Sequence, residues 1–522
     1  MSRVKRFTHS LGSGYVLLGG NVLFTLASVP LALHYLSKKE FGLWALVVQV
    51  LGYLQLIDLG MSSSIARILI DHKDAPGGGV YGAIIKTGAL VLAVQGAIIA
   101  VAGAVVSLWL PALFSVPAVY QREFQIVAAG QCLVTGALFA PRITSHVLQA
   151  HQRYDAWNLC QLFSLAVNFG AMWLGFILGW GLYSLLAASL GSYIFGAIGG
   201  LVMATRLKLF PAAGAWGAAS LKIFHELFSY GKEIFLLSLG WQLVNASQVI
   251  VVTSTLGLDA AAVWSIATKP FTLAQTVVNR LFDFSAAAFA EMMVLGERER
   301  LLVRFRDLMI LSASLAAWAG SAVALCNPGF LVLWTKGRIS WSGSSDWLMA
   351  LLVVVYSTTR CIHGLIGTSK DIRALKYIYP LEGAAFLGLA FLAAPRWGMS
   401  GIIASALVTN VLFSGVYGFW RVEKYFGLHD PKTLLAWLRG PLFCLVALAA
   451  VFAGLGWVSH SWNTYLRLGV EGAAAAFIGL GLFWRVGLSP ELRAETAALA
   501  RNLRGRVRSL VQGQLGAPST KV

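Results

Sequence analysis

The chain has 522 residues, of which 58% are hydrophobic and only 12% are charged, and its formal net charge is +18. Soluble globular proteins carry about 25% charged residues, so this composition excludes a soluble globular protein and indicates an integral membrane protein. The five cysteines lie within apolar segments at spacings that fit no metal site, and we expect neither a metal nor any other cofactor.

Apolar segments of about 18–25 residues recur along almost the whole chain, and each could cross ~30 Å of hydrocarbon as a helix. Helices are expected because a spanning segment must satisfy its own backbone hydrogen bonds. The first segment follows MSRVKR without a cleavage site and is expected to remain uncleaved. We predict fourteen transmembrane helices, at residues 12–36, 41–60, 81–110, 124–149, 155–178, 181–204, 230–256, 260–290, 306–333, 346–368, 375–394, 398–421, 435–457 and 464–486.

The distribution of lysine and arginine predicts how these helices are oriented. With Met1 in the cytoplasm, the connections on that side and both termini hold roughly 28 of the 40 basic residues, against about 7 outside. This bias predicts a multi-pass membrane protein with both termini cytoplasmic. It also accounts for most of the net charge, so no nucleic-acid partner is expected.

An internal repeat predicts the domain organisation. A shift of 220 positions aligns the first two spans with the seventh and eighth, placing Leu36 on Leu256 and Trp44 on Trp264. Six spans per half is an even number, so both halves enter from the same side and form two parallel six-helix lobes around a central cavity. The expected parts are an N-terminal lobe (1–210), a cytoplasmic linker (211–229), a C-terminal lobe (230–424), two additional helices (425–488) and a basic tail (489–522).

The basic tail is expected to be an amphipathic helix on the cytoplasmic surface. Ser489 stands at the N-cap position and Pro490 at the first helical position. The leucines that follow alternate with arginines, a pattern that suits the anionic inner leaflet. Membrane lipid is therefore an expected partner.

Two stretches of the first half resemble a known family. Residues 36–67 read LSKKEFGLWALVVQVLGYLQLIDLGMSSSIAR: a short turn, F-G-L-W, a span ending in D-L-G, and a serine-rich basic helix. Together with APRITSHVLQAHQRYD (140–155), this resembles the polysaccharide-export flippases (Wzx-type O-antigen or exopolysaccharide translocases) of the multidrug/oligosaccharidyl-lipid/polysaccharide (MOP) exporter superfamily.

The resemblance covers the twelve-span core and implies both a fold and a function. It implies two six-helix lobes in a V and the transfer of undecaprenyl-pyrophosphate-linked oligosaccharide from the inner to the outer leaflet by alternating access. A polysaccharide polymerase and a chain-length regulator would be the accompanying partners.

Two arginines inside predicted spans are the first site candidates. Charged groups at bilayer depth cost about 2.5 kcal/mol or more and are functional candidates for that reason. A shift of 218 positions superposes PRITSHVL, which holds Arg142, on TRCIHGLI, which holds Arg360. Arginine binds phosphate oxygens through two parallel hydrogen bonds, so the pair could grip an anion from both lobes. The alternative is that each arginine braces its own lobe.

Polar stripes on three spans supply further candidates. In 260–290, polar residues from Lys269 to Asp283 recur at helical spacing, although Arg280 and Asp283 could simply pair with each other. The amides of the other two stripes could equally hold helices together. The predicted cavity residues are Arg142, Arg360, Lys269, Arg280, Asn245, Gln242, Thr276, Asn21 and Thr25.

Four titratable residues are candidates for ion coupling: Asp283, His146, His363 and Asp58. Both histidines lie one turn beyond the arginines and could carry protons, although a buried histidine is more often a hydrogen-bonded core residue. Asp58 could instead pair with Arg67 or cap a helix.

The predicted interior is mainly basic, which favours an anionic cargo. A cation-coupled multidrug exporter on the same fold is the alternative, and it would need buried acidic groups. A membrane glycan polymerase or ligase would need a catalytic cluster on the outer face. The outer connections are short and hold no such cluster, so we expect a transporter without enzymatic activity.

Overall fold

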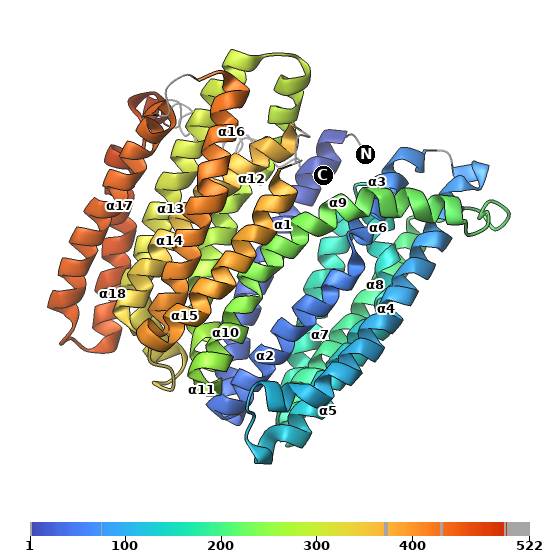
Figure 1. Cartoon of the computed structure of the whole chain (residues 1–522), viewed down its shortest axis with the longest axis horizontal. Coiled ribbons are helices and arrows are strands. Elements are labelled where there is room, and N and C mark those ends of the chain that lie inside the picture. The colour runs from blue at the N-terminus through green and yellow to red at the C-terminus, as the bar shows by residue number, and fades with distance from the viewer. Residues whose placement is uncertain (1–2, 75, 370–373, 429–431, 495–496, 498–522) are drawn as a thin grey trace, which may run out of the picture. The chain divides into compact units, whose positions relative to one another are not determined.

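A computed structural model describes residues 3–74, 76–369, 374–428, 432–494 and 497, and the regular secondary structure within these ranges is entirely helical (Figure 1). The predicted all-α fold class is therefore confirmed. The helices fall into two units. Unit 1 comprises Met1–Lys269, Leu331–Trp341 and Ile372–Ser414, and unit 2 comprises Pro270–Phe330, Ser342–Asp371 and Gly415–Val522.

Unit 1 holds the N-terminal helices and α15. In chain order its elements are α1 (Arg3–Tyr35), α2 (Lys38–Leu54), the 3₁₀ turn η1 (Gln55–Asp58), α3 (Met61–His72), η2 (Pro76–Gly78), α4 (Val80–Leu113), α5 (Ala118–Ala137), η3 (Ala140–Arg142), α6 (Ile143–Ala150), α7 (Tyr154–Ile177), α8 (Tyr183–Arg206), α9 (Leu221–Asn245), α10 (Ser247–Leu256), α11 (Leu258–Ala267) and α15 (Leu375–Asn410).

Unit 2 holds the remaining helices, and three elements contain residues of both units: α12, α13 and the π-helical segment Val411–Gly415. Its elements are α12 (Lys269–Val294), α13 (Arg298–Trp334), α14 (Gly343–Thr368), α16 (Val416–Phe426), α17 (Lys432–Ser459), α18 (Thr464–Ala474) and α19 (Leu480–Leu482), with π-helical segments at Val411–Gly415, Ala475–Gly479 and Phe483–Gly487. Ser489 Oγ accepts a hydrogen bond from the Leu492 backbone N–H at 3.3 Å, as the predicted cap requires. Most of the predicted tail lies outside the described residues.

Close backbone contact joins α15 to α9 within unit 1. A Cβ atom on Gly240 would lie 2.2 Å from the carbonyl carbon of Tyr379, so only glycine permits this approach. Residues 331–341 are joined to α1, where Trp334 Nε1 donates to the Leu26 carbonyl at 2.8 Å. The predicted lobe boundaries at 210 and 230 both fall inside unit 1, and the lobes themselves stay a prediction.

Eleven of the described helices are long and apolar enough to cross a membrane. The count becomes twelve if α5 and α6, which meet at a bend of 45°, form one span. The fourteen predicted spans are not confirmed as a count. The difference has two sources. The stretch 375–426 counts once although it holds two predicted spans separated by Gly398, whose φ is 58°. α12 is too polar to count, since Arg280 and Asp283 lie within it.

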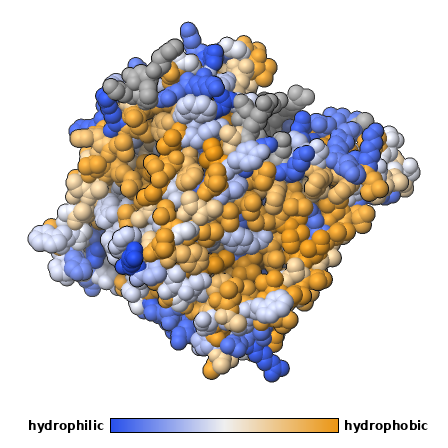
Figure 2. Space-filling model, viewed as in Figure 1, coloured by the Kyte–Doolittle hydropathy of each residue, from blue (hydrophilic) through white to orange (hydrophobic). Residues whose placement is uncertain are grey.

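The outer surface of the helices suits a lipid environment. Large apolar side chains such as Leu23, Leu108 and Leu392 are more than 60% exposed. On the face shown in Figure 2, hydrophobic residues cover the middle of the helices and hydrophilic residues gather near their ends. This distribution is the one expected of a multi-pass membrane protein.

The D-L-G sequence forms a tight turn between α2 and α3. Leu59 and Gly60 both adopt left-handed backbone conformations, with φ of 49° and 74°. The Asp58 carboxylate caps α3, accepting from the Ser62 hydroxyl at 2.7 Å and from its backbone N–H. The alternative pairing of Asp58 with Arg67 is wrong, because Arg67 pairs with Asp71 one turn further along α3 at 2.6 Å.

A buried ion pair fixes α18 against α17 and gives the first testable prediction. Glu471, fully buried, accepts hydrogen bonds from Arg467 Nε at 2.8 Å and from Ser459 Oγ at 2.7 Å. Glu471→Ala is expected to lower the free energy of unfolding by about 3–5 kcal/mol, because Arg467 loses its counter-ion inside the protein. Thermal unfolding of the detergent-purified protein would measure the change.

Glu491→Ala is the matched control for this variant. Glu491 pairs with Arg306 at 2.8 Å, but its side chain is 73% exposed, so its loss should cost less than about 1 kcal/mol. Equal effects of the two variants would contradict the assignment of Glu471 as a buried structural ion pair.

Candidate functional site

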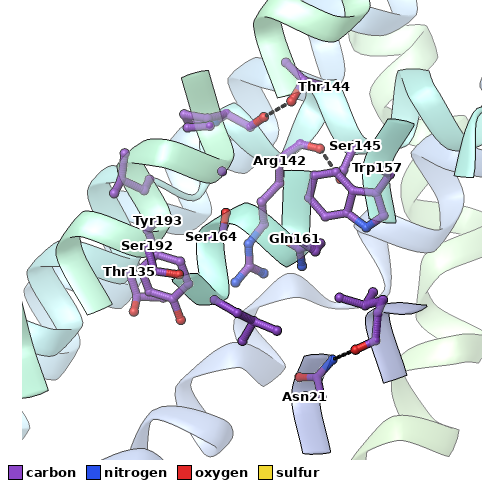
Figure 3. A pocket seen from close by; sticks show the side chains of 16 residues that line it. Asn21, Thr135, Arg142, Thr144, Ser145, Trp157, Gln161, Ser164, Ser192 and Tyr193 are labelled. Carbon is purple, nitrogen blue, oxygen red and sulfur yellow. Dashed lines mark hydrogen bonds between the residues drawn. The ribbon is translucent and has the colours of Figure 1, made fainter. Parts of the chain in front are cut away.

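A cavity of about 390 Å³ lies inside unit 1, between α1, α5, α6, α7 and α8 (Figure 3). Its apolar wall includes Leu17, Leu138 and Leu165, and Trp157 adds an indole ring. The remaining wall is unusually rich in hydrogen-bonding groups for a space among apolar helices. The polar lining residues are Asn21, Thr135, Arg142, Thr144, Ser145, Gln161, Ser164, Ser192 and Tyr193.

A break between α5 and α6 brings Arg142 into this cavity. Pro141 has no backbone N–H to donate within a helix, and the chain forms a three-residue 3₁₀ turn, Ala140–Arg142, at the bend. The side chains of Ser145 and Thr144 donate to the carbonyls of Arg142 and Pro141, at 2.6 and 2.9 Å. The sequence thus supplies the bend, and the two hydroxyl groups bond back to the carbonyls beside it.

The Arg142 guanidinium extends into the cavity with Ser192 and Tyr193 on one side and Trp157 on the other (Figure 3). Its Cζ lies 4.2 Å from the centre of the Phe139 ring, a cation–π contact. Asp58 interacts with it electrostatically but does not line the cavity, and its carboxylate is engaged in capping α3.

The cavity lining carries a single positive charge. Of the sixteen lining residues, Arg142 is the one ionisable as a cation, and none is an acid. The Thr135 and Ser164 hydroxyls are buried and have no hydrogen-bond partner within the described structure. The cavity therefore offers one guanidinium and two hydroxyls without a partner to a ligand.

The structure places the other predicted residues of unit 1 in different surroundings. Asn21 lines the cavity, and its Nδ2 donates to the Leu17 carbonyl at 2.9 Å. His146 lies one turn beyond Arg142, is 8% exposed, and neither ring nitrogen has a partner in the described structure. Thr25 lies on α1 outside the cavity lining.

Gln242 and Asn245 lie on α9, away from this cavity lining. A Cβ on Gly52 of α2 would stand 2.5 Å from Gln242 Nε2, so this amide packs directly on α2. Asn245 Nδ2 donates to the Trp241 carbonyl at 2.9 Å. These contacts favour the helix-joining alternative for Gln242, and a cavity role for either residue stays a prediction.

Unit 2 contains a second cluster of predicted residues, centred on Asp283. Its carboxylate accepts from Arg360 at 2.8 Å and lies 3.9 Å from Arg280. The Arg360 Cζ also stands 5.6 Å from the centre of the Phe282 ring. The i,i+3 pairing of Arg280 with Asp283 is confirmed. The bond from Arg360 is new, since the two residues lie on different helices.

The remaining candidates lie near this cluster in sequence but differ in role. Thr276 Oγ1 donates to the Thr272 carbonyl at 2.8 Å. His363 is 7% exposed, and a Cβ on Gly418 of α16 would lie 3.2 Å from its Nε2, so it packs between α14 and α16. Lys269 is the first residue of α12 and ends the first segment of unit 1, Met1–Lys269.

Arg142 and Arg360 differ in local structure although their sequences align. Arg142 lies at a bend between two helices, whereas Arg360 lies within the uninterrupted α14. Each belongs to a different unit. A cavity that they share stays a prediction.

Three buried acids, Asp346, Glu382 and Glu471, were not singled out from the sequence. Glu382 on α15 is 3% exposed, and its carboxylate accepts from Asn410 Nδ2 at 2.8 Å and from the Ser414 hydroxyl. A lone acid inside the predicted span 375–394 was the signal that could have found it. The cavity residues Gln161, Ser164 and Tyr193 carried no such signal, because neutral polar residues are common in membrane helices.

Exchanging the charges of Asp283 and Arg360 tests the unit 2 cluster. Asp283→Arg alone would place three arginines together, and Arg360→Asp alone would place two acids beside one arginine. Because like charges then repel each other, each single variant should lower the free energy of unfolding by about 1 kcal/mol. The double variant should recover most of that loss in a thermal-unfolding double-mutant cycle. Additive losses would show that the 2.8 Å contact does not stabilise unit 2.

The helical fold and its apolar outer surface indicate a multi-pass membrane protein, and solved structures of the MOP superfamily share this fold. Among solved structures, an inward-facing multidrug resistance MATE family transporter of the MOP superfamily is similar at a TM-score of 0.66 and 12% identity, covering 78% of this chain and 96% of that one. The lipid II flippase MurJ, in an inward closed conformation, is similar at a TM-score of 0.64 and 12% identity, covering 92% and 99%. A MOP superfamily transporter from Pyrococcus furiosus is similar at 0.54 and 14%, covering 81% and 94%.

Sequence comparison then identifies the family. The family model described as polysaccharide biosynthesis protein matches residues 13–288, which is more than half of the chain. The chain belongs to this family, and the predicted place among polysaccharide flippases of the MOP superfamily is confirmed. No curated protein matches the chain by sequence.

Proposed function

We propose that this protein is a flippase that moves undecaprenyl-pyrophosphate-linked oligosaccharide, an O-antigen or exopolysaccharide repeat unit, from the inner to the outer leaflet. It would lie in the cell inner membrane with both termini cytoplasmic. The observation that carries the proposal is the unit 1 cavity, where Arg142 stands among neutral polar groups with no acidic lining residue.

The chemistry of this cavity suits an anionic, hydroxyl-rich cargo. A guanidinium forms charge-assisted, paired hydrogen bonds to phosphate or carboxylate oxygens. The amides and hydroxyls around it match the hydroxyl groups of a glycan. The family description and the likeness to a protein named as a lipid II flippase support the same class of cargo.

Alternating access is part of the proposal. The similar MATE structures include one inward-facing and one outward-facing conformation. Asp58, Asp283, His146 and His363 remain the candidates for ion coupling. Loss of glycan transport in vesicles when the proton or sodium gradient is collapsed would support coupling, and unchanged transport would show an uncoupled route.

A cation-coupled multidrug exporter on the same fold is not favoured. Such a transporter needs acidic groups to bind cationic drugs, whereas the unit 1 cavity lining holds a cation and no acid. The family match likewise concerns polysaccharide rather than drugs.

Deletion of the gene tests the function directly. We expect the lipid-linked repeat unit to accumulate on the cytoplasmic side and surface polysaccharide to disappear, with both reversed by the wild-type gene. An interaction with a polysaccharide polymerase or chain-length regulator would appear as co-purification with the tagged protein. Normal surface polysaccharide in the deletion strain would refute the proposal.

A further inference from the structure

We infer that the unit 1 cavity binds a sugar residue that carries one carboxylate, such as a hexuronate. This site would then recognise the glycan part of the cargo and not its pyrophosphate. The inference rests on the proposed flippase function and deepens it, because it names which chemical part of the cargo this cavity recognises.

The charge of the cavity is the first argument. Its lining provides one guanidinium, with no second cation and no acid. A carboxylate carries one negative charge, and its two oxygens match the two parallel N–H groups of arginine. A pyrophosphate carries at least two negative charges, and the lining supplies no second cation to compensate the excess charge.

The position of Arg142 agrees with a carboxylate ligand. No carboxylate lines the cavity to pair with its guanidinium, whose Cζ lies 4.2 Å from the centre of the Phe139 ring. Figure 3 shows the guanidinium head group directed into the cavity, among Ser164, Gln161 and Tyr193. The N–H groups of a guanidinium placed there can bind a carboxylate through two parallel hydrogen bonds.

The neutral lining groups supply the second argument, because they suit sugar hydroxyls. The Thr135 and Ser164 hydroxyls are 2% and 5% exposed by residue and have no partner in the described structure. Buried hydroxyls without a partner cost free energy, which a ligand's hydroxyl groups would offset. Trp157 offers an apolar face for the opposite side of a pyranose ring.

Size gives the third argument. A volume of about 390 Å³ lies near the lower end of the range of roughly 300–1,000 Å³ for small-molecule sites. The cavity can therefore take one or two sugar rings, not an entire lipid-linked oligosaccharide. It suits a recognition pocket for one part of the cargo.

Ligand titration of the purified full-length protein tests the inference. Methyl β-glucuronide should bind saturably by isothermal titration calorimetry, and methyl β-glucoside, which lacks the carboxylate, should bind at least tenfold more weakly. Arg142→Gln should weaken glucuronide binding at least tenfold, and Ser164→Ala by about 3- to 10-fold. Arg67→Gln, which removes an exposed arginine of α3, should leave binding unchanged.

The opposing results are equally specific. The inference would be overturned if Arg142→Gln still bound the glucuronide. It would also be overturned if inorganic pyrophosphate bound more tightly than the glucuronide and its binding depended on Arg142. Thermal unfolding of each variant shows whether it is folded, and Arg142→Lys keeps the charge while losing the planar fork. If Arg142→Gln fails to fold, weaker glucuronide binding by Arg142→Lys supports the inference, and unchanged binding refutes it.

Analysis of the intermediate in the deletion strain separates this inference from the proposed function. An accumulated lipid-linked glycan that contains an acidic sugar supports both. A neutral accumulated glycan refutes the acidic-sugar inference while the flippase function stands. Absence of any accumulated lipid-linked glycan refutes the function itself, whatever the titrations show.

Discussion

Arg142→Ala is expected to abolish surface display of the polysaccharide while leaving the protein in the membrane. Arg142 is the one cationic lining residue of the unit 1 cavity. Truncating one partner of a desolvated, hydrogen-bonded charge pair typically costs about 2–5 kcal/mol, or more than tenfold in binding. Display is measured by surface polysaccharide staining, and the amount of protein by immunoblot of the membrane fraction.

Two control variants make this result specific. Arg142→Lys keeps the charge but loses the planar fork, so intermediate display is expected. Arg67→Ala removes an arginine whose side chain is 52% exposed and paired with Asp71, and normal display is expected. Normal display from Arg142→Ala, with the protein present in the membrane, would remove Arg142 from the substrate site.

Much of the fold could be predicted from the sequence, because lipid imposes a strong pattern on it. Apolar length alone specified helices, and the predicted all-α class is confirmed. The span count was harder to obtain. Hydropathy cannot show how the two helices within 375–426 meet at the kink of Gly398, nor whether a helix as polar as α12 crosses the membrane. Both questions depend on the neighbouring helices.

The candidate site was predictable where a residue conflicted with its surroundings. Arg142 stood out because a guanidinium is costly in an apolar segment, and the structure places it in a cavity with Asn21. Gln161, Ser164 and Tyr193 did not stand out, because the direction of a neutral side chain depends on how its helix is rotated. The bond between Arg360 and Asp283 joins separate helices, so no local pattern could reveal it.

The D-L-G turn illustrates a further limit. The motif was recognisable, yet one of the two reasons for its glycine, the close approach to Gly231 on α9, lies far along the chain. The resemblance showed that the glycine recurs in a known pattern, and the structure shows why this position needs it.

Gly60→Ala is expected to remove most of the folded protein from the membrane. Gly60 has a φ of 74°, where an L-residue costs about 1–2 kcal/mol. A Cβ atom there would also lie 2.4 Å from the Gly231 carbonyl oxygen. This atom is backbone and cannot move aside as a flexible side chain would, so α3 and α9 would have to separate. The loss is measured as membrane-inserted, detergent-extractable protein and as a lower unfolding temperature.

Gly77→Ala is the matched control for Gly60→Ala, since a Cβ atom there would meet nothing within 4 Å. Its effect on stability should stay within about 0.5 kcal/mol. Gly231→Ala approaches the same contact from the other helix, where its Cβ would lie 2.8 Å from the Leu59 carbonyl oxygen, and it should also destabilise. If Gly60→Ala and Gly231→Ala both fold as stably as Gly77→Ala, the close packing of the D-L-G turn on α9 is not what holds α3 in place.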